Sequence, residues 1–443
     1  MASVLERQQT LLADYTRLGG SSYEGLVRST LRQLNFNSDD MQLPVEVLSG
    51  GQKKLVAFSR LLINKPDLLV LDEPDNHLDL EGKAFLEQLI RNYEGAVVIV
   101  SHDRYLLDLV VDEIAELEDG KLSLYPGNYS EYAFEKGMRL QRQAQVFQAQ
   151  QKEITRLEQA ATRLMLWGKI YDNNKFSRRG KSILNHLEKI ERIDRPILER
   201  KHMNLALTGW VGSNKVLECK EVDKVFPSTE PGKSEVIILA GVNLLVRHGE
   251  RVGLVGPNGA GKSLLFRLIL GQDEPSDGAI DVGPSVKIGY YAQQHETLVY
   301  ERTLLDTVRL AGSFSEEKAV AILGKFLFSY RQSQAKIATL SGGERSRLQM
   351  ALLVLSGANF LLLDEPTNNL DIASTEVLEN ALDDFEGTVL TISHDRYFLD
   401  RVVERIEVLE HGCLSGYRGN YSDYQGQQKV FGNPRGELPD LGL

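Results

Sequence analysis

One glycine-rich stretch of the chain has the composition of a phosphate-binding loop. It consists of Gly256, Pro257, Asn258, Gly259, Ala260, Gly261, Lys262 and Ser263, and it directly follows the apolar run Val252–Val255. A strand that enters such a loop leaves backbone N–H groups open to an anion, and the helix beginning near Lys262 points its positive end at the same place. Lys262 would reach the β- and γ-phosphates and Ser263 would ligate Mg²⁺. A plain glycine turn is the simpler alternative, but the terminal Lys-Ser favours a nucleoside triphosphate site, called the P-loop below.

The elements that position this loop belong to a chain of 443 residues with ordinary apolar content. That length allows two or three domains, each with its own core. No apolar run approaches the roughly 20 residues of a membrane helix, and the charges of Glu6 and Arg7 come too early for a secretory signal. Cys219 and Cys413 show no metal-binding or disulfide-type spacing. We therefore expect a globular cytoplasmic protein without structural zinc or disulfides.

An internal repeat organises the chain. Three motifs recur at an offset of 292 residues, namely Leu-Ser-Gly-Gly at 48–51 and 340–343, Leu-Asp-Glu-Pro at 71–74 and 363–366, and Ser-His-Asp-Arg-Tyr at 101–105 and 393–397. The offset persists to Gly-Asn-Tyr-Ser at 127–130 and 419–422, so the copies match over about eighty residues without a net insertion. The chain therefore holds two homologous domains.

The first copy is shorter at its amino-terminal side. Ser341 follows Lys262 by 79 residues, whereas only 48 residues precede Ser49. A first P-loop at the same spacing would lie before Met1, so we interpret the sequence as a fragment or as the product of a late start codon. Residues 1–37 instead show helix-like spacings that predict the end of a helical subdomain. These spacings involve Leu11, Leu12 and Tyr15, and then Leu26, Leu31 and Leu34.

These motifs resemble the nucleotide-binding domains of the ATP-binding cassette (ABC) superfamily. The tandem arrangement, the phrases DEPDNHLD and DEPTNNLD, and the Gly-Asn-Tyr-Ser element after each copy resemble the ABC-F subfamily in particular. The resemblance implies α/β P-loop NTPase domains in tandem, joined by an antiparallel α-helical hairpin, with ATP and Mg²⁺ as cofactors and no membrane domain. We expect the C-terminal portion of a first ABC domain at 1–128, a hairpin linker at 129–206, a complete ABC domain at 207–426 and a tail at 427–443.

The resemblance also assigns chemical roles to single residues. The apolar run Phe360–Leu363 predicts a buried strand that presents Asp364, which would hold Mg²⁺ through water, and Glu365, which would polarise the attacking water. His394 would contact the γ-phosphate. The counterparts in the first copy are Asp72, Glu73 and His102.

Three further positions match family loops. Gln293 matches the glutamine that senses metal and γ-phosphate, and Asp371 matches the loop after the Asp-Glu-Pro motif. Phe226 stands where an aromatic ring would stack on adenine. For Gln293 and Phe226, a role in packing is the alternative.

In this superfamily each ATP lies between the P-loop of one domain and the signature motif of the other. The resemblance implies that the first signature completes the site at the P-loop through Ser49, Gly50, Gly51 and Gln52. The second signature, formed by Ser341, Gly342, Gly343 and Glu344, would serve a site whose P-loop is absent from the printed sequence. We therefore expect this chain to assemble one ATP site of two, by intramolecular pairing of its domains in a monomer.

Between the two copies the apolar pattern becomes that of paired helices. Leu140, Phe147, Ile154 and Ala161 stand seven residues apart, and Ile183, Leu187, Ile190 and Ile197 continue on a partner helix. The spacing predicts an antiparallel hairpin whose first helix runs from about 130 to 166, with residues 167–181 as the connection.

Charge separates this hairpin from the rest of the chain. Residues 130–205 carry a net charge of +7 within a chain of −11. The predicted connection combines five cations with one acid, and Trp167, Tyr171 and Phe176 lie among them. Cations that neutralise phosphates and aromatics that stack on bases suit RNA, although a solvated charged turn explains charge alone equally well. In the family the linker reaches ribosomal RNA and the P-site tRNA, which would assign this contact to Lys175, Arg178, Arg179 and Lys181.

The sequence therefore predicts an ATP-hydrolysing protein whose nucleotide state controls its residence on the ribosome. The short connection is more typical of a housekeeping factor than of a member that protects ribosomes from antibiotics, but both stay open. The ATP-binding subunit of a membrane transporter is the alternative from another class, and a non-hydrolysing scaffold is a third. The fused tandem with a basic hairpin favours the ribosomal function.

Overall fold

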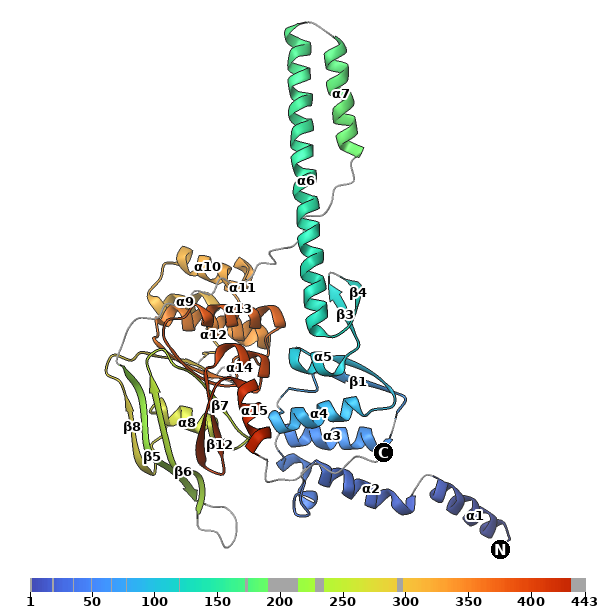
Figure 1. Cartoon of the computed structure of the whole chain (residues 1–443), viewed down its shortest axis with the longest axis vertical. Coiled ribbons are helices and arrows are strands. Elements are labelled where there is room, and N and C mark those ends of the chain that lie inside the picture. The colour runs from blue at the N-terminus through green and yellow to red at the C-terminus, as the bar shows by residue number, and fades with distance from the viewer. Residues whose placement is uncertain are drawn as a thin grey trace. The chain divides into compact units, whose positions relative to one another are not determined.

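The computed structural model describes residues 2–17, 20–34, 36–48, 50–64, 66–76, 78–118, 120–171, 174–189, 214–227, 235–292 and 298–431 (Figure 1). The chain divides into two compact units. One contains residues 1–110 and 203–443, and the other contains residues 111–202. The first unit thus unites most of both copies of the repeat, and the second unit holds the helical hairpin.

The second copy is built on a six-stranded sheet with the strand order β13-β12-β7-β11-β10-β9. Five strands run parallel, and β13 alone pairs antiparallel, with β12. The strands are β7 (Arg251–Val255), β9 (Ile288–Tyr291), β10 (Phe360–Asp364), β11 (Thr388–Ile392), β12 (Arg405–Glu410) and β13 (Cys413–Arg418). This α/β architecture confirms the predicted fold class.

Both faces of this sheet are covered by apolar layers. On one face lie α8 (Lys262–Ile269) and a three-stranded antiparallel sheet of β5 (Lys215–Pro227), β6 (Glu235–Arg247) and β8 (Asp277–Val282). The other face is covered by helices. These are α9 (Leu304–Gly312), α10 (Glu316–Lys325), α11 (Tyr330–Ser333), α12 (Gly342–Ser356), α13 (Ile372–Asp383), α14 (Arg396–Val402) and α15 (Tyr421–Phe431), with the 3₁₀ turn η3 (Ile337–Thr339). Every residue of β10 and β11 is buried, which explains their continuous apolar sequences.

The first copy contributes a smaller sheet of two parallel strands, β1 and β2. Its elements are α1 (Ala2–Arg17), α2 (Gly20–Gln33), η1 (Asp40–Gln42), η2 (Val45–Val47), α3 (Gly50–Asn64), β1 (Leu68–Asp72), α4 (Leu80–Arg91), β2 (Ala96–Val100) and α5 (Arg104–Val110). The helices expected at the start are present as α1 and α2. Leu11, Leu12 and Tyr15 are nevertheless 62%, 64% and 55% exposed, so their spacing does not mark a packed face of α1 in the described structure.

One face of the β1–β2 sheet is exposed although its side chains are apolar. Leu68, Val70, Val98 and Val100 are between 52% and 67% exposed. The residues 292 positions later are Phe360, Leu362, Leu390 and Ile392, which are at most 1% exposed beneath α8 and the antiparallel sheet. The described part of the first copy has no counterpart of those covering elements, so the same pattern of apolar residues has different surroundings in the two copies.

The second unit joins a β-hairpin to two long helices, which confirms the predicted helical hairpin. Its elements are β3 (Glu113–Glu118), β4 (Lys121–Pro126), α6 (Tyr129–Ile170) and α7 (Asn174–Lys189). Helix α6 starts with a capping box in which Asn128 and Glu131 each accept the other's backbone N–H. Tyr132 and Lys136 then fasten the helix to Glu116 of β3.

The predicted connection of the helical hairpin is wrong, because residues 167–170 and 174–181 are helical. The sequence predicted a loop because the regular spacing of apolar residues is interrupted before Ile183. The segment also contains Gly168 and Gly180, and glycine is a poor helix former. Both glycines are buried where the helices meet. A Cβ on Gly168 would clash with Ser177, and one on Gly180 would press on Met165. The glycines therefore permit close helix contact rather than ending the helices.

Paired substitutions test the difference between the two sheets. Leu362→Ala should cost about 2–5 kcal/mol of unfolding free energy, because it leaves a cavity in a fully buried layer. Val70→Ala, at the matching position, should cost less than about 1 kcal/mol, because the side chain is exposed. Denaturant midpoints followed by circular dichroism measure both variants. A loss for Val70→Ala as large as that for Leu362→Ala would mean that the face is covered in solution.

Candidate active site

The P-loop follows β7 as the sequence predicts. Gly256, Gly259 and Gly261 have φ angles of 149°, 84° and 100°, which side chains rarely adopt. A Cβ on Gly256 would also collide with the carbonyl of Leu409 in β12. Lys262 opens α8, and its Nζ donates to the carbonyls of Gly256 and Pro257 at 2.7 and 2.9 Å. In the ligand-free protein, the Lys262 side chain therefore lies against the loop that would bind the phosphates of a nucleotide.

Two carboxylates stand at the carboxyl end of β10. Asp364 is the last residue of this strand and Glu365 the first beyond it, and they are 2% and 6% exposed. Glu365 has a left-handed backbone with φ of 50°, which turns its side chain away from the strand direction. His394 lies beside it, with Nε2 3.4 Å from Glu365 Oε1 and its backbone N–H donating to Oε2 over 3.3 Å. The structure therefore brings the predicted catalytic residues together.

Burial controls the protonation of these groups. Burial, and then the charge of Asp364, raises the pKa of Glu365 to about 8. Burial, and then the charges of Lys262 and Lys83, lowers the pKa of His394 well below its ordinary value. Burial also lowers the pKa of Lys262, against the attraction of Glu365 and Asp79. At neutral pH, this ligand-free site holds a protonated Glu365 and a neutral His394.

The second signature forms the start of α12. Ser341 is its N-cap and Glu344 completes a capping box, with the Ser341 N–H donating to Glu344 Oε2 over 2.9 Å. This hydrogen bond is the first cause of the lowered pKa of Glu344. Gly342 and Gly343 follow with no side chain over the first turn of the helix. In the first copy, Gly50, Gly51 and Gln52 open α3 in the same way, whereas Ser49 lies outside the described residues.

A polar cavity of about 530 Å³ joins residues of both copies. Its lining includes Gly51 of the first signature, Asn258 of the P-loop, and the catalytic candidates Glu365 and His394. Gly342 and Gly343 of the second signature also line it, together with Glu73 and His102 of the first copy. The cavity has room for a charged ligand between the two halves of the repeat.

Asp79 is a site residue that the sequence reasoning missed. It is the N-cap of α4, and its Oδ2 accepts the backbone N–H of Asn258 over 3.1 Å. The same offset of 292 residues relates it to Asp371, the N-cap of α13, so the repeat itself was the signal. Asp371 accepts the N–H of Ser374 over 2.8 Å within its own helix. The P-loop thus rests on a residue of the first copy.

The first copy repeats the carboxylate–histidine pair in a more open setting. His102 Nε2 lies 3.3 Å from Glu73 Oε1, and Glu73 has a φ of 46°, close to that of Glu365. The His102 side chain is 51% exposed against 11% for His394, and Asp72 is exposed whereas Asp364 is buried. The same motif therefore has a wetter environment in the first copy.

Two other predicted contacts have different outcomes. Phe226 lies near the end of β5, 39% exposed, with Lys224 Nζ 5.2 Å from the centre of its ring. It does not belong to the described lining of the cavity, so its stacking on adenine stays a prediction. Gln293 lies outside the described residues.

The oxygen donors near the P-loop fit a magnesium ion that arrives with a nucleotide. No group of three His, Cys, Asp or Glu side chains in the described ranges could hold a metal ion alone. Asp364 supplies a buried carboxylate, and Ser263 lies in the first turn of α8. Magnesium commonly takes one or two such ligands and completes its shell with water and phosphate oxygens.

Models of two protein families match the chain. One, described as ABC transporter, matches residues 7–76 and 239–368. The other, its extension and also described as ABC transporter, matches residues 115–206. No helix in the described ranges has the length and apolarity needed to cross a membrane.

Several relatives align with nearly the whole chain. The ATP-binding proteins YdiF and YfmR of Bacillus subtilis are 37% and 38% identical over 97% and 96% of this chain. The chain spans 65% and 66% of their lengths. The energy-dependent translational throttle protein EttA of Escherichia coli K12 is 36% identical over 90% of this chain and 71% of its own. Among solved structures, an archaeal ribosome recycling factor, aABCE1, shares the fold, with a TM-score of 0.60 and 22% identity over 96% of this chain and 74% of its own.

The raised pKa of Glu365 predicts how stability depends on pH. Between the ordinary value of 4.5 and about 8, the folded ligand-free protein keeps a proton that the unfolded chain releases. Stability should therefore fall as pH rises through this window. Glu365→Gln cannot ionise, so it should raise the apparent Tm by ~4 °C or more at pH 8 and by little at pH 5. Thermal scans without nucleotide measure this, with the exposed Glu376→Gln as control. Equal Tm differences at both pH values would contradict the assignment.

Proposed function

Because the chain belongs to the ABC-F family of ATP-binding cassette proteins, we propose that it binds and hydrolyses ATP with Mg²⁺ and that its nucleotide state controls its binding to the ribosome. The observation that carries the proposal is the cavity in which the P-loop, the first signature and the Glu365–His394 pair meet. Phosphate groups would find backbone N–H donors on one side and a buried acid–base pair on the other. Such a site suits transfer of a phosphoryl group to water.

Each residue of the site would have one task. Backbone N–H groups of Gly256–Ser263 and the end of α8 would bind the β- and γ-phosphates, and Lys262 would turn from its carbonyl partners to the same oxygens. Asp364 and Ser263 would hold Mg²⁺, which would supply positive charge near the phosphates and favour the ionised form of Glu365. Glu365 would then accept a proton from the attacking water, while His394 would donate to a phosphate oxygen.

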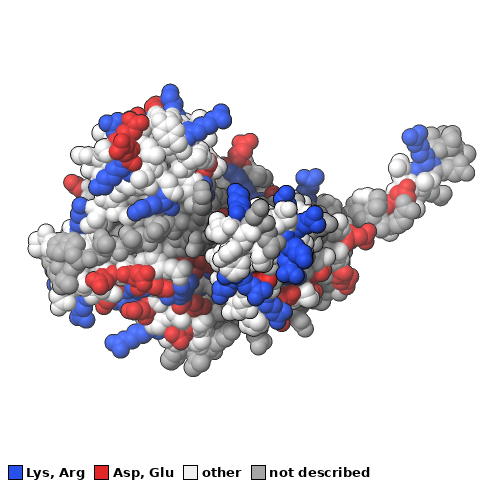
Figure 2. Space-filling model, turned by 90° about the horizontal axis from the view of Figure 1, so that it is seen from above, with Lys and Arg blue, Asp and Glu red and all other residues white. Residues whose placement is uncertain are grey.

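The hairpin is the proposed contact with RNA. Helix α6 has 42 residues and therefore extends about 60 Å. Lys175, Arg178, Arg179 and Lys181 are exposed on the first turns of α7, and Figure 2, which looks down the hairpin, shows Lys and Arg side chains gathered at this end. Trp167 and Phe176 pack edge to face at 6.3 Å, whereas Tyr171 is 69% exposed. These charges, together with relatives named for translation, support ribosomal RNA and tRNA as partners.

The transporter alternative predicts a different companion. A transporter subunit would copurify with a membrane protein, whereas the proposed function requires copurification with ribosomes. The basic hairpin favours the ribosome, because a row of cations at a helix end suits phosphates. Housekeeping and antibiotic-protecting functions share the site and differ in the ribosomal complex that is recognised.

Two substitutions test the chemistry. Glu365→Gln should keep ATP binding and lower kcat by about 10²–10⁴-fold, because the base is lost while the phosphate contacts stay. Lys262→Ala should lose ATP binding itself, because a buried cation leaves the P-loop. Calorimetric binding and phosphate release measure the two effects. Turnover in Glu365→Gln equal to that of the parent would remove Glu365 as the base.

A charge reversal tests the RNA contact. Changing Lys175, Arg178, Arg179 and Lys181 to Glu removes four cations that could neutralise phosphates, so ribosome binding should weaken and its salt dependence should flatten by about one unit of slope per lost contact. Cosedimentation of the Glu365→Gln protein with ribosomes and ATP, over a salt series, measures both.

A matched control reverses four exposed cations of the second copy. These are Lys287, Lys325, Arg331 and Lys336. The control should pellet as the parent does, and ATP binding should be unchanged in both variants. Equal pelleting of the hairpin variant and the control at every salt concentration would show that the hairpin charges are only solvated.

A further inference from the structure

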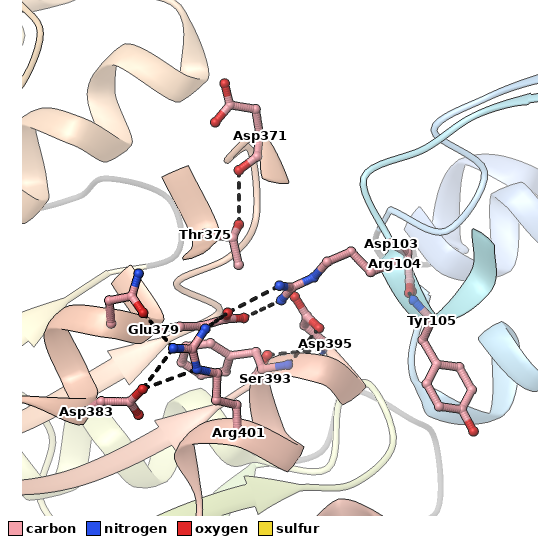
Figure 3. A network of polar contacts seen from close by, with 12 residues as sticks. Asp103, Arg104, Tyr105, Asp371, Thr375, Glu379, Asp383, Ser393, Asp395 and Arg401 are labelled. Atoms are coloured by element: carbon pink, nitrogen blue, oxygen red, sulfur yellow. Dashed lines mark hydrogen bonds and ion pairs between the residues drawn. The ribbon is translucent and has the colours of Figure 1, made fainter. Parts of the chain in front are cut away.

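The two copies of the repeat are joined by an exchanged pair of arginines. Arg104 and Arg396 occupy the same place in the repeat, two residues after the histidine of each copy. Arg104 contacts Glu379 of α13, with Nη1 3.2 Å from Glu379 Oε2 (Figure 3). Arg396 makes the corresponding contact with Glu87 of α4. Because Glu87 and Glu379 are also 292 residues apart, each copy holds the other through the same two residue types.

Both ion pairs are buried. The side chains of Arg104 and Glu379 are 6% and 1% exposed, and those of Arg396 and Glu87 are 3% and 11% exposed. Each guanidinium also lies over a tyrosine ring of the other copy, Arg104 at 5.0 Å from Tyr397 and Arg396 at 4.2 Å from Tyr105. A buried charge is tolerated only beside its partner. Arg104 donates to Glu379 through both Nη1 and Nη2, whereas Arg396 donates to Glu87 through Nη2. The two arginines therefore have defined positions.

One of the two pairs is directly connected to the hydrolytic residues. Arg396 begins α14, immediately after the loop that carries His394. His394 touches Glu365 twice, through Nε2 at 3.4 Å and through its backbone N–H at 3.3 Å. Only one residue, Asp395, separates His394 from Arg396, so the position of Arg396 limits where His394 can lie relative to Glu365.

The acidic partner of Arg396 is connected to the P-loop. Glu87 lies eight residues after Asp79 on α4, which is about two helical turns. Asp79 accepts the backbone N–H of Asn258 over 3.1 Å. Helix α4 of the first copy therefore contacts the P-loop through its N-cap and Arg396, the first residue of α14, two turns later.

The other pair has different surroundings. Arg104 follows His102, which lies 3.3 Å from Glu73 in the more exposed setting of the first copy. Its partner Glu379 is shared with Arg401 of the second copy, whose Nη1 lies 3.0 Å from Oε2. Leu109 stands at the position that matches Arg401. Within the described ranges Glu87 therefore pairs with Arg396 alone, and Glu379 pairs with two arginines.

We propose that Glu87 is a positioning residue for hydrolysis at the P-loop of the second copy. Through Arg396, Glu87 fixes the positions of His394 and Glu365 relative to the phosphates that the P-loop would bind. Helix α4 sets the distance between the Asp79–Asn258 contact and the Glu87–Arg396 contact. This inference rests on the proposed function, because it assumes hydrolysis at that site. The Arg104–Glu379 pair secures the contact between the copies without this link, and it is the matched control.

Isosteric substitutions distinguish a role of Glu87 in positioning His394 and Glu365 from a role only in holding the two copies together. Glu87→Gln should lower kcat for ATP hydrolysis by about 10-fold or more, because small misplacements of catalytic groups are costly, while the KM and the Kd for ATP change by less than about 2-fold. Glu379→Gln should lower kcat by less than about 3-fold. Glu87→Asp, which keeps the charge, should restore part of the kcat lost in Glu87→Gln. The same three variants in the Glu365→Gln background report ATP binding without turnover.

Histidine signals test the pair without any turnover. The protein is labelled with ¹³C at histidine, and His102→Gln and His394→Gln assign the two resonances. In the ligand-free protein, Glu87→Gln should shift the His394 signal and leave that of His102 in place. Glu379→Gln should do the reverse. If Glu87→Gln does not fold, Glu87→Asp and Arg396→Lys give the same comparison.

The outcomes divide clearly. An unchanged kcat together with an unmoved His394 signal in Glu87→Gln overturns the proposal, as do equal losses of kcat in Glu87→Gln and Glu379→Gln. A parent chain that hydrolyses no ATP refutes the proposed function. The histidine signals would then still decide whether Glu87 positions His394.

Discussion

Four buried charges hold together the two copies of the repeat. In the described residues, two ion pairs cross the contact between the copies, Glu87 with Arg396 and Arg104 with Glu379. Glu379 also pairs with Arg401 of its own copy. Removing one partner of such a buried pair typically costs about 3–5 kcal/mol, because the remaining charge is left without water or a counter-ion. The charges therefore favour one alignment of the copies.

The two copies use the same sequence pattern for different purposes. In the second copy β10 lies within a sheet covered on both faces, so Asp364 and Glu365 emerge from a rigid and dry environment. The β1–β2 pair has one exposed face, and the corresponding Glu73 and His102 are more accessible to water. Burial raises the pKa of both glutamates, to about 8 for Glu365, whose side chain is 6% exposed against 27% for Glu73. The second copy therefore holds the more deeply buried carboxylates, while Asp79 and Gly51 of the first copy lie at the P-loop and the cavity, and Glu87 contacts Arg396.

Local sequence predicted the parts of the site whose chemistry is local. The P-loop and the β10 carboxylates follow from residue types at short spacings, whereas His394 was implied by the resemblance to the ABC superfamily, and the structure places Glu365 and His394 as neighbours. The repeat relates Asp79 to Asp371, so the sequence could have indicated Asp79 as a site residue. It was missed because the sequence of a helix N-cap does not show which loop its second carboxylate oxygen will contact. The partnership of Arg104 with Glu379 joins residues 275 positions apart, and no pattern of apolar or charged residues encodes it.

The hairpin shows where local signals mislead. Residues 167–181 were predicted as a loop because the regular apolar spacing is interrupted there, and Gly168 and Gly180 within them reduce helix propensity. Packing overrides propensity here, since only glycine lets the two helices approach at these points. Four of the five cations predicted for the loop consequently lie on the first turns of α7, and Lys169 lies in the last turn of α6.

A structure of the Glu365→Gln protein with Mg²⁺ and ATP tests most directly whether one site is shared by the two copies. The γ-phosphate should lie between the P-loop at 256–263 and the first signature at 49–52, with Asp79 at the P-loop and His394 within hydrogen-bond distance of a phosphate oxygen. A nucleotide held by the second copy alone, with residues 49–52 distant from its phosphates, would contradict this account.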